Sequence, residues 1–326
     1  MNSPKLSLSR RRMLAALTAM AALPIRVSAQ SRPVRLIVAS SAGSTIDVIA
    51  RTVQSTLSSA LDAPLVVEDI AGAGSVIAMQ TLARSAPDGS ALALQTNNMV
   101  IAPLLIKPAP YDAAKDFTAI AIVGSIPLAV VVNASRVAAK DPKEFIALLK
   151  SKGDTLNYGS SGNGTILHLA AELIEDEIGV RVTHVPYKGV APMVTDLVGG
   201  RIDFVATALP AVDAFVKSGK LRIIGMLTPE RVAMAPEVPT FAEQGFPKSI
   251  AEVWFAVLGP KGMASAVIKK VHDALLVTFN NPAVREVLEK QGNTVKVSTP
   301  EEAQAVIRQD VLKYSALATK INLTRS

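Results

Sequence analysis

The sequence predicts an α/β fold with mostly parallel sheets, and three observations support this prediction. Short apolar runs have the length of β-strands, and segments between them carry apolar residues at three- and four-residue steps, which is the period of a helix. Strand and helix patterns alternate along the chain, as in βαβ units. The 326 residues are also enough for two domains.

Nine strands are expected between residues 34 and 258. They are 34–39, 64–68, 91–95, 128–132, 155–159, 182–185, 202–207, 221–227 and 253–258. Three helices have the clearest periodicity. The first carries Ile46, Ile49, Ala50, Val53, Leu57 and Leu61; the second carries Ile166, Leu169, Ala170, Leu173 and Ile174; the third carries Ala303, Val306, Ile307, Tyr314 and Leu317.

Composition excludes several classes of function. With 49% hydrophobic residues the chain is not disordered, and without cysteine it has no disulfide, thiolate metal site, cysteine nucleophile or cysteine-linked lipid anchor. The three histidines lie far apart in the sequence, so we expect no metal site and no cofactor. The net charge of +7 falls to +2 beyond residue 29, where 29 basic residues face 27 acidic ones. A nucleic-acid partner is therefore not expected.

The first 29 residues have the pattern of an export signal. Arg10, Arg11 and Arg12 precede an apolar run over 13–23, and a small-residue cleavage site follows at 27–29. The arginine pair favours twin-arginine export, with the general secretory route as the alternative. We expect cleavage before Gln30 and a periplasmic protein.

Two Gly/Ser-rich loops each lie between a strand and a helix. Loop 1 is residues 40–47 (SSAGSTID) and loop 2 is residues 159–165 (GSSGNGT). The start of a helix offers unpaired N–H groups and partial positive charge, which suit a carboxylate or phosphate. Ordinary capped turns are the alternative interpretation, but the repetition of the layout favours an anion site.

Two side chains near these loops have two possible roles each. Asp47, three residues after Ser44, resembles the acidic member of a capping box; it would fix the loop or accept a hydrogen bond from a ligand ammonium. His168, three residues after Thr165, could reach the mouth of loop 2, or could pack or cap the helix. The candidate ligand-binding residues are Ser41, Gly43, Ser44, Thr45, Asp47, Thr96, Asn97, Ser160, Ser161, Gly162, Gly164, Thr165, His168 and Thr207.

Enzyme signatures do not fit the sequence. Loop 2 lacks the G-x-S-x-G pattern of a nucleophile elbow, its glycines are not in dinucleotide-binding order, and no phosphate-binding G-x-x-x-x-G-K-[ST] pattern occurs. The alternatives that remain open are an exported hydrolase using Ser160 or Ser161 and a cofactor-dependent oxidoreductase.

Several stretches together carry a family resemblance. They include LIVASSAGSTIDVIAR (36–51), VVEDIAGAG (66–74), the long LNYGSSGNGTILHLAAELIEDEIGVRVTHVPYKG (156–189) and WFAVLGP (254–260). The chain resembles the tripartite tricarboxylate transporter substrate-binding receptors, or Bug-type periplasmic solute-binding proteins, from about residue 31 to 323.

The resemblance implies a two-lobed periplasmic binding-protein fold, type II-like, with the ligand cleft between the lobes. Lobe 1 would be 30–131 plus 254–326 and lobe 2 would be 132–253. It also implies a non-enzymatic, monomeric receptor that captures a small carboxylate by lobe closure, for a tripartite membrane transporter or a sensor. Ser44, Ile46, Thr207 and Ala208 depart from the family pattern, so no relative's selectivity can be transferred.

Overall fold

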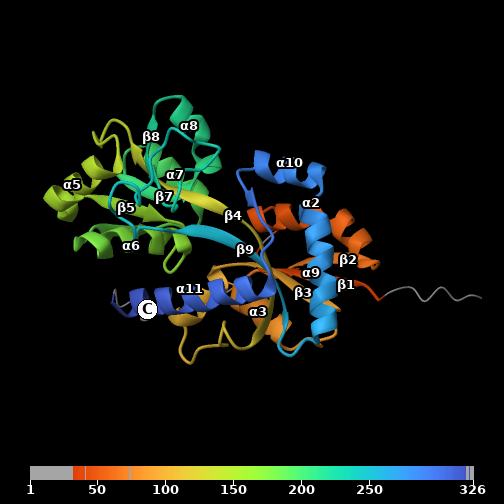
Figure 1. Ribbon diagram of the computed structural model, residues 1–326. Coiled ribbons are helices and arrows are strands. Elements are labelled where there is room, and N and C mark those ends of the chain that lie inside the picture. Colours follow the sequence, from red (N-terminus) through yellow and green to blue (C-terminus); the bar gives the residue numbers. More distant parts are fainter. Residues whose placement is uncertain (1–31, 41, 73–74, 321–322, 324–326) are drawn as a thin grey trace, which may run out of the picture. The chain divides into compact units, whose positions relative to one another are not determined.

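The structure is a computed structural model that describes residues 32–40, 42–72, 75–320 and 323 (Figure 1). The predicted export signal and Ser41 lie outside these residues. The strands are β1 (Val34–Val38), β2 (Leu65–Asp69), β3 (Ala91–Thr96), β4 (Phe117–Asn133), β5 (Asn157–Ser160), β6 (Thr183–Pro186), β7 (Phe204–Ala208), β8 (Leu221–Met226), β9 (Glu252–Pro260) and β10 (Thr294–Val295).

Helices follow most of the strands. They are α2 (Thr45–Leu61), α3 (Val76–Ala83), α4 (Asn98–Ile101), α5 (Pro142–Lys152), α6 (Ile166–Ile178), α7 (Val190–Val198), α8 (Asp213–Lys217), α9 (Ser265–Phe279), α10 (Pro282–Lys290) and α11 (Pro300–Lys320), with 3-10 turns at Ala102–Leu105, Gly153–Thr155 and Leu209–Ala211. Among the described helices, none combines the length and apolar character needed to cross a membrane.

The strands form one mixed sheet in the order β2-β1-β3-β9-β4-β7-β5-β6, and β8 and β10 each pair with β4. The pairs β1–β2, β1–β3, β5–β6 and β5–β7 are parallel. Every pair that involves β4 or β9 is antiparallel. The expectation of mostly parallel sheets is therefore wrong, because β4 and β9 run in opposite directions between two parallel groups (Figure 1).

β4 is much longer than the predicted strand at 128–132. Its residues 117–127 pair with β9, and its residues 128–133 pair with β7 and β8. Gly124 and Pro127 interrupt the apolar pattern and concealed the first part of the strand. Gly124 is needed there, since a Cβ would lie 2.5 Å from the Thr294 carbonyl oxygen of β10.

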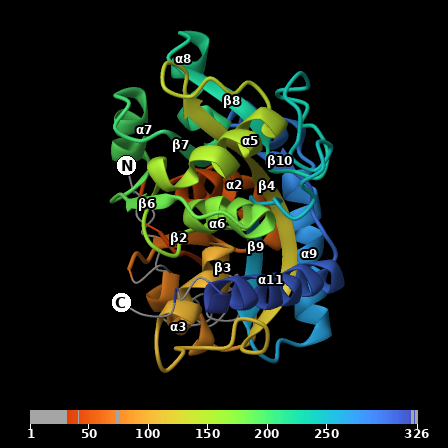
Figure 2. The ribbon, with the colours of Figure 1, turned by 90° about the vertical axis from the view of Figure 1, so that its left-hand side faces the viewer.

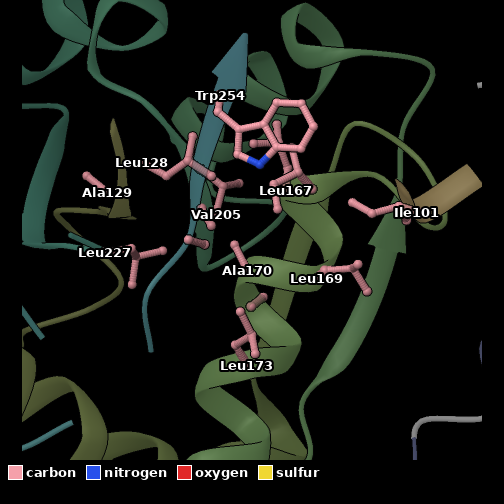
Figure 3. Close-up of a cluster of buried hydrophobic side chains, with 14 of the residues drawn as sticks. Ile101, Leu128, Ala129, Leu167, Leu169, Ala170, Leu173, Val205, Leu227 and Trp254 are labelled. Carbon is pink, nitrogen blue, oxygen red and sulfur yellow. The ribbon is translucent and has the colours of Figure 1, made fainter. Parts of the chain in front are cut away.

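Two clusters of buried hydrophobic side chains lie against the sheet. Figure 3 shows part of the larger one, in which Leu167, Ala170 and Leu173 of α6 lie near side chains of β4, β7 and β9. α11 packs against β4, α4 and α6 (Figure 2). The packing of α6 matters for function because loop 2 leads directly into this helix.

Each of the nine predicted strands is present, with ends that shift by a few residues apart from the long extension of β4. The three predicted helices correspond to α2, α6 and α11. β10, with two residues, was not predicted, because so short a segment has no detectable period.

Candidate functional site

Loop 1 is held by reciprocal hydrogen bonds at the start of α2. Ser44 is the N-cap, and its hydroxyl accepts from the Asp47 N–H at 3.4 Å. The Asp47 carboxylate accepts from the Gly43 N–H at 2.7 Å. A capping box usually bonds the N–H of the N-cap itself; here the carboxylate reaches one residue further back, to a glycine with a φ of +79°.

The Asp47 carboxylate is buried, and its negative charge is paired with the Arg51 guanidinium. Its second oxygen lies 2.6 Å from Nε of Arg51, and another guanidinium nitrogen of Arg51 lies 2.7 Å from Asp69 at the end of β2. The Arg51 guanidinium and the Gly43 N–H hold the pKa of Asp47 below its usual value. Burial, together with the nearby Asp47 charge, raises the pKa of Asp69. Of the two roles expected for Asp47, the contacts match the one that fixes the loop.

Loop 2 repeats this arrangement at the start of α6 with different chemistry. Thr165 is the N-cap and accepts from the His168 N–H at 3.4 Å. Nδ1 of His168 accepts from the N–H of Gly164, whose φ is +67°, at 3.0 Å. An Nδ1 that accepts cannot carry a proton, so the ring proton is on Nε2 and the ring is neutral.

A second imidazole lies directly against His168. The rings of His168 and His184 are stacked, 3.9 Å apart and inclined by 7°. His184 lies on β6 opposite Tyr158 of β5, and its Nε2 is 2.7 Å from the Ser160 hydroxyl. That hydroxyl also bonds the carbonyl and the N–H of Gly162. The two histidines thus contact opposite ends of loop 2.

Acidic groups lie beneath the histidines. Glu172 lies 3.4 Å from Nε2 of His168 and accepts from the Tyr158 hydroxyl at 2.7 Å and from Arg181 at 2.9 Å. Burial opposes its ionisation, but the hydrogen bonds from His168 and Tyr158 bring the pKa of Glu172 below its usual value. Burial and the Glu172 charge raise the pKa of Glu175 to about 8.

A cavity of about 230 Å³ lies beside loop 2. Its lining residues are Asn98, Ala102, Leu105, Ile106, Asn163, Gly164 and Thr165. Loop 2 therefore meets the segment that follows β3, and Gly164 is so close to Leu105 that a Cβ would overlap with that side chain. Since β1 and β3 are parallel neighbours, loop 1 and this segment follow carboxyl ends at one sheet edge, where ligands of α/β proteins bind.

Comparison with known proteins identifies the family of the chain. The profile of the tripartite tricarboxylate transporter family receptor matches residues 49–323. The chain belongs to this family.

Among its relatives is protein BugT of Bordetella pertussis, 32% identical over 289 residues, which are 88% of each chain. The solved periplasmic binding protein BugD is 27% identical with a TM-score of 0.73, and covers 90% of this chain and 99% of its own. An R. palustris protein solved with adipate is 26% identical with a TM-score of 0.76 over the same shares. The fold is thus the two-lobed periplasmic binding-protein fold, and the family is one of solute-binding receptors.

The remaining candidate binding residues of this receptor differ in exposure. Thr45, the first residue of α2, is exposed, while Thr96 at the end of β3 accepts from the Asn98 N–H at 3.3 Å. Asn97 is fully buried and donates to the Glu252 carbonyl of β9. Thr207 is buried within β7, opposite Ala129. Ser161 donates to Thr165 within loop 2.

Three neighbours of loop 2 were not predicted as site residues of the receptor: Asn98, Leu105 and His184. Asn98 follows directly after Asn97, so the rule that ligands bind beyond strand ends could have suggested it. Leu105 could not be found, because its contact with Gly164 depends on how separate parts of the chain pack. His184 requires the pairing of β5 with β6 to be known.

The described residues contain no group of three or more His, Asp or Glu side chains arranged to hold a metal ion.

Proposed function

We propose that this receptor binds a small carboxylate in the periplasm, with loops 1 and 2 gripping it from the two lobes. The observation that carries the proposal is the matched pair of loops, each ending at the start of a helix of 13 residues or more. The first N–H groups of such helices have no acceptor within the helix. They can therefore donate to a carboxylate, and the helix dipole favours its charge.

Neutral donors would provide the recognition. Neither loop contains Lys or Arg, and no residue lining the cavity beside loop 2 is charged. Backbone amides and hydroxyls in an enclosed site make directed bonds to a carboxylate that depend little on salt once the ligand is covered. The relative solved with adipate supports an organic acid as the ligand class.

Lobe closure would accompany binding. We place lobe 1 at 30–131 plus 254–326 and lobe 2 at 132–253, so that β4 and β9 connect them. Support comes from β4, which pairs with β9 over residues 117–127 and with β7 and β8 over 128–133. Two connecting strands can act as a hinge that turns ligand contact into closure.

The wider setting is also a proposal. An export signal over residues 1–29, of twin-arginine or general secretory type, would deliver the protein to the periplasm as a monomer. The loaded receptor would then pass its acid to a tripartite membrane transporter or present it to a sensor.

A thermal-shift screen of carboxylic acids, neutral sugars and metal ions tests the ligand class. One or a few acids should stabilise the protein, since a ligand at about 100 times its Kd adds roughly 2.7 kcal/mol. Stabilisation by a sugar or a metal ion, with no response to any acid, would contradict the proposal.

A glycine substitution locates the ligand in loop 2. Gly162 has a φ of +138°, and a Cβ there would lie 3.5 Å from the Tyr187 carbonyl oxygen, so a β-branched side chain would change the conformation of the loop. Gly162→Val should weaken binding of the stabilising acid at least about tenfold, equivalent to about 1.4 kcal/mol. Gly179→Val is the matched control, because Gly179 also has a positive φ but lies at the far end of α6. Equal affinity in both variants would exclude loop 2 from the site.

One contact favours a second candidate function, a hydrolase. Ser160 and His184 are within hydrogen-bonding distance, as a nucleophile and its base would be. However, Ser160 is completely buried and its hydroxyl also bonds Gly162 within the loop. Ester turnover that is lost in Ser160→Ala would favour the hydrolase; binding of an acid without turnover favours the receptor.

A further inference from the structure

Two stacked histidines, His168 and His184, each form a hydrogen bond with a residue of loop 2. Gly164 and Ser160 stand at the two ends of the loop, and each is bonded to one ring of the stacked pair. Between these two residues lies Gly162, which has a φ of +138° and whose carbonyl accepts from the Thr165 hydroxyl. His168 is 5% exposed and Ser160 is completely buried, so water cannot easily replace either contact.

We propose that His168 and His184 are positioning residues that shape loop 2 for the ligand, and that they do so only while both rings are neutral. The proposal rests on loop 2 being part of the carboxylate site. It names residues that set the affinity without touching the acid, and it gives that affinity a dependence on pH.

The contact of His168 is incompatible with a charged ring. A protonated imidazole carries N–H groups on both nitrogens. Nδ1 would then point an N–H at the N–H of Gly164, 3.0 Å away, where it now accepts a hydrogen bond. The two donors would repel each other, and the Gly164 end of loop 2 would have to move.

The stack opposes a charge on His184 as well. Its ring lies 3.9 Å from that of His168, so two cations would repel strongly. Burial, with a further contribution from His168, lowers the pKa of His184 to about 4. A lowered pKa means that the neutral ring supports the fold fully above its ordinary value of 6.5, and that this support is lost as the pH falls towards 4.

Titratable and charged groups on the neighbouring segments surround the two histidine rings. Tyr158 lies on β5, Glu172 and Glu175 on α6, and Arg181 on the segment before β6. Glu172 attracts a proton to the pair and Arg181 opposes this, while Glu172 also holds the Nε2 proton of His168. Acid would therefore add a proton at Nδ1 of His168, which faces the N–H of Gly164, and loop 2 would have to yield.

The chain offers a matched control, since His272 is its third and last histidine. His272 lies on α9 and contacts the Ser298 carbonyl oxygen, away from loop 2. Suitable variants are His184→Gln, whose amide can replace Nε2 towards Ser160, His168→Asn, whose amide oxygen can replace Nδ1 towards Gly164, and His272→Gln as the control.

The first experiment follows the Gly164 amide and the histidine rings by NMR, from pH 8 to 3.5, in the ligand-free protein as the host cell processes it. The Gly164 signal should move with the midpoint of the His168 or His184 ring, and the His272→Gln variant should behave identically. In His184→Gln and His168→Asn this movement should shrink or shift to another pH. A Gly164 signal that is constant across the range would overturn the proposal, even if no variant folds.

The second experiment measures acid binding by thermal shift at pH 7.5 and 4.0, with acids that stay ionised at both values, such as pyruvate. The apparent affinity of a binding acid should fall at least about twofold at pH 4.0 in the unmodified protein and in His272→Gln, because a ring with a pKa of about 4 is half protonated there. The fall should be smaller in His184→Gln, and an equal fall would overturn the proposal. If no acid in the whole panel binds at pH 7.5, the proposed function fails while the NMR experiment still decides the positioning role.

Discussion

Loops 1 and 2 have the same backbone arrangement, but different side chains accept the hydrogen bond that fixes it. In each, a glycine with positive φ precedes an N-cap hydroxyl, and the side chain three residues after the cap accepts the glycine N–H. In loop 1 the acceptor is the Asp47 carboxylate, compensated by Arg51; in loop 2 it is the neutral His168 ring, stacked on His184. The spacing fixes the loop conformation, whereas the acceptor decides its response to charge and pH.

The surroundings of the two glycines differ as well. A Cβ on Gly43 would meet nothing within 4 Å, while one on Gly164 would overlap with Leu105. Loop 1 is therefore constrained mainly by its own hydrogen bonds, and loop 2 also by the packing of the segment that follows β3. The pair of loops allows each contribution to be tested separately.

The largest effect is expected from alanine at Gly164, with alanine at Gly43 as the comparison. Gly43→Ala should lower the free energy of unfolding by about 1 kcal/mol, the cost of a left-handed conformation. Gly164→Ala adds a steric overlap in a packed region and should cost about 3 kcal/mol in total. Urea denaturation measures both. Equal losses would mean that loop 2 moves away from Leu105 without cost.

Removing the acceptor side chains should have the next largest effect. Asp47→Ala or His168→Ala leaves a glycine N–H without its partner, and each should cost about 2 kcal/mol of unfolding free energy. Asp47→Asn and His168→Asn retain an oxygen acceptor and should recover part of this loss. Chemical denaturation at pH 7 gives the values, and no recovery in either variant would show that the hydrogen bond to glycine contributes little.

The contribution of the Asp47 carboxylate to stability should depend on pH. The pKa of Asp47 is lowered, so its contribution is complete above the ordinary value of 3.8 and is lost as the pH falls below it. The stability difference between the unmodified protein and Asp47→Asn should therefore persist at pH 5 and decrease below pH 4, as measured by urea denaturation at each pH. A difference that already disappears at pH 5 would contradict this role of the Asp47 charge.

The smallest effect is expected at the N-caps. Ser44→Ala should cost about 0.5 to 1 kcal/mol, which is typical of a lost cap. Thr165→Ala should cost somewhat more, because Thr165 also donates to the Gly162 carbonyl and accepts from Ser161. Thermal unfolding of both variants measures the difference, and a larger loss at Ser44 would reverse the assigned importance of the two caps.

Much of the fold could be predicted from local patterns. Apolar runs located nine of the ten described strands, and the capping relation between Ser44 and Asp47 was visible in the sequence. The sheet directions were not predictable in this way, because the antiparallel course of β4 and β9 depends on how distant segments pair. Gly124 and Pro127 hid residues 117–127 of β4 for the same reason: whether they fit in a strand there depends on β9 and β10.

The positions of the two loops of the candidate site were predictable from the sequence, but the contacts of their side chains were not. Loop positions follow from glycines beside helix starts, but His168 had two possible roles until its ring was seen to accept from Gly164. His184 gave no signal, since its contact with Ser160 requires the register of β5 and β6. Asn97 is buried and bonded to β9, while the next residue, Asn98, lines the cavity; the ligand contact expected of Asn97 stays a prediction.

The central claim is that two matched loops bind one small organic acid. Native mass spectrometry of the gently purified protein, as the cell processes it, tests this most directly. The unmodified protein should carry an added mass that is released on mild activation and identified as a small carboxylic acid, and Gly162→Val should carry much less of it than Gly179→Val does. A bound sugar or metal ion, or an acid retained equally in both variants, would contradict the account.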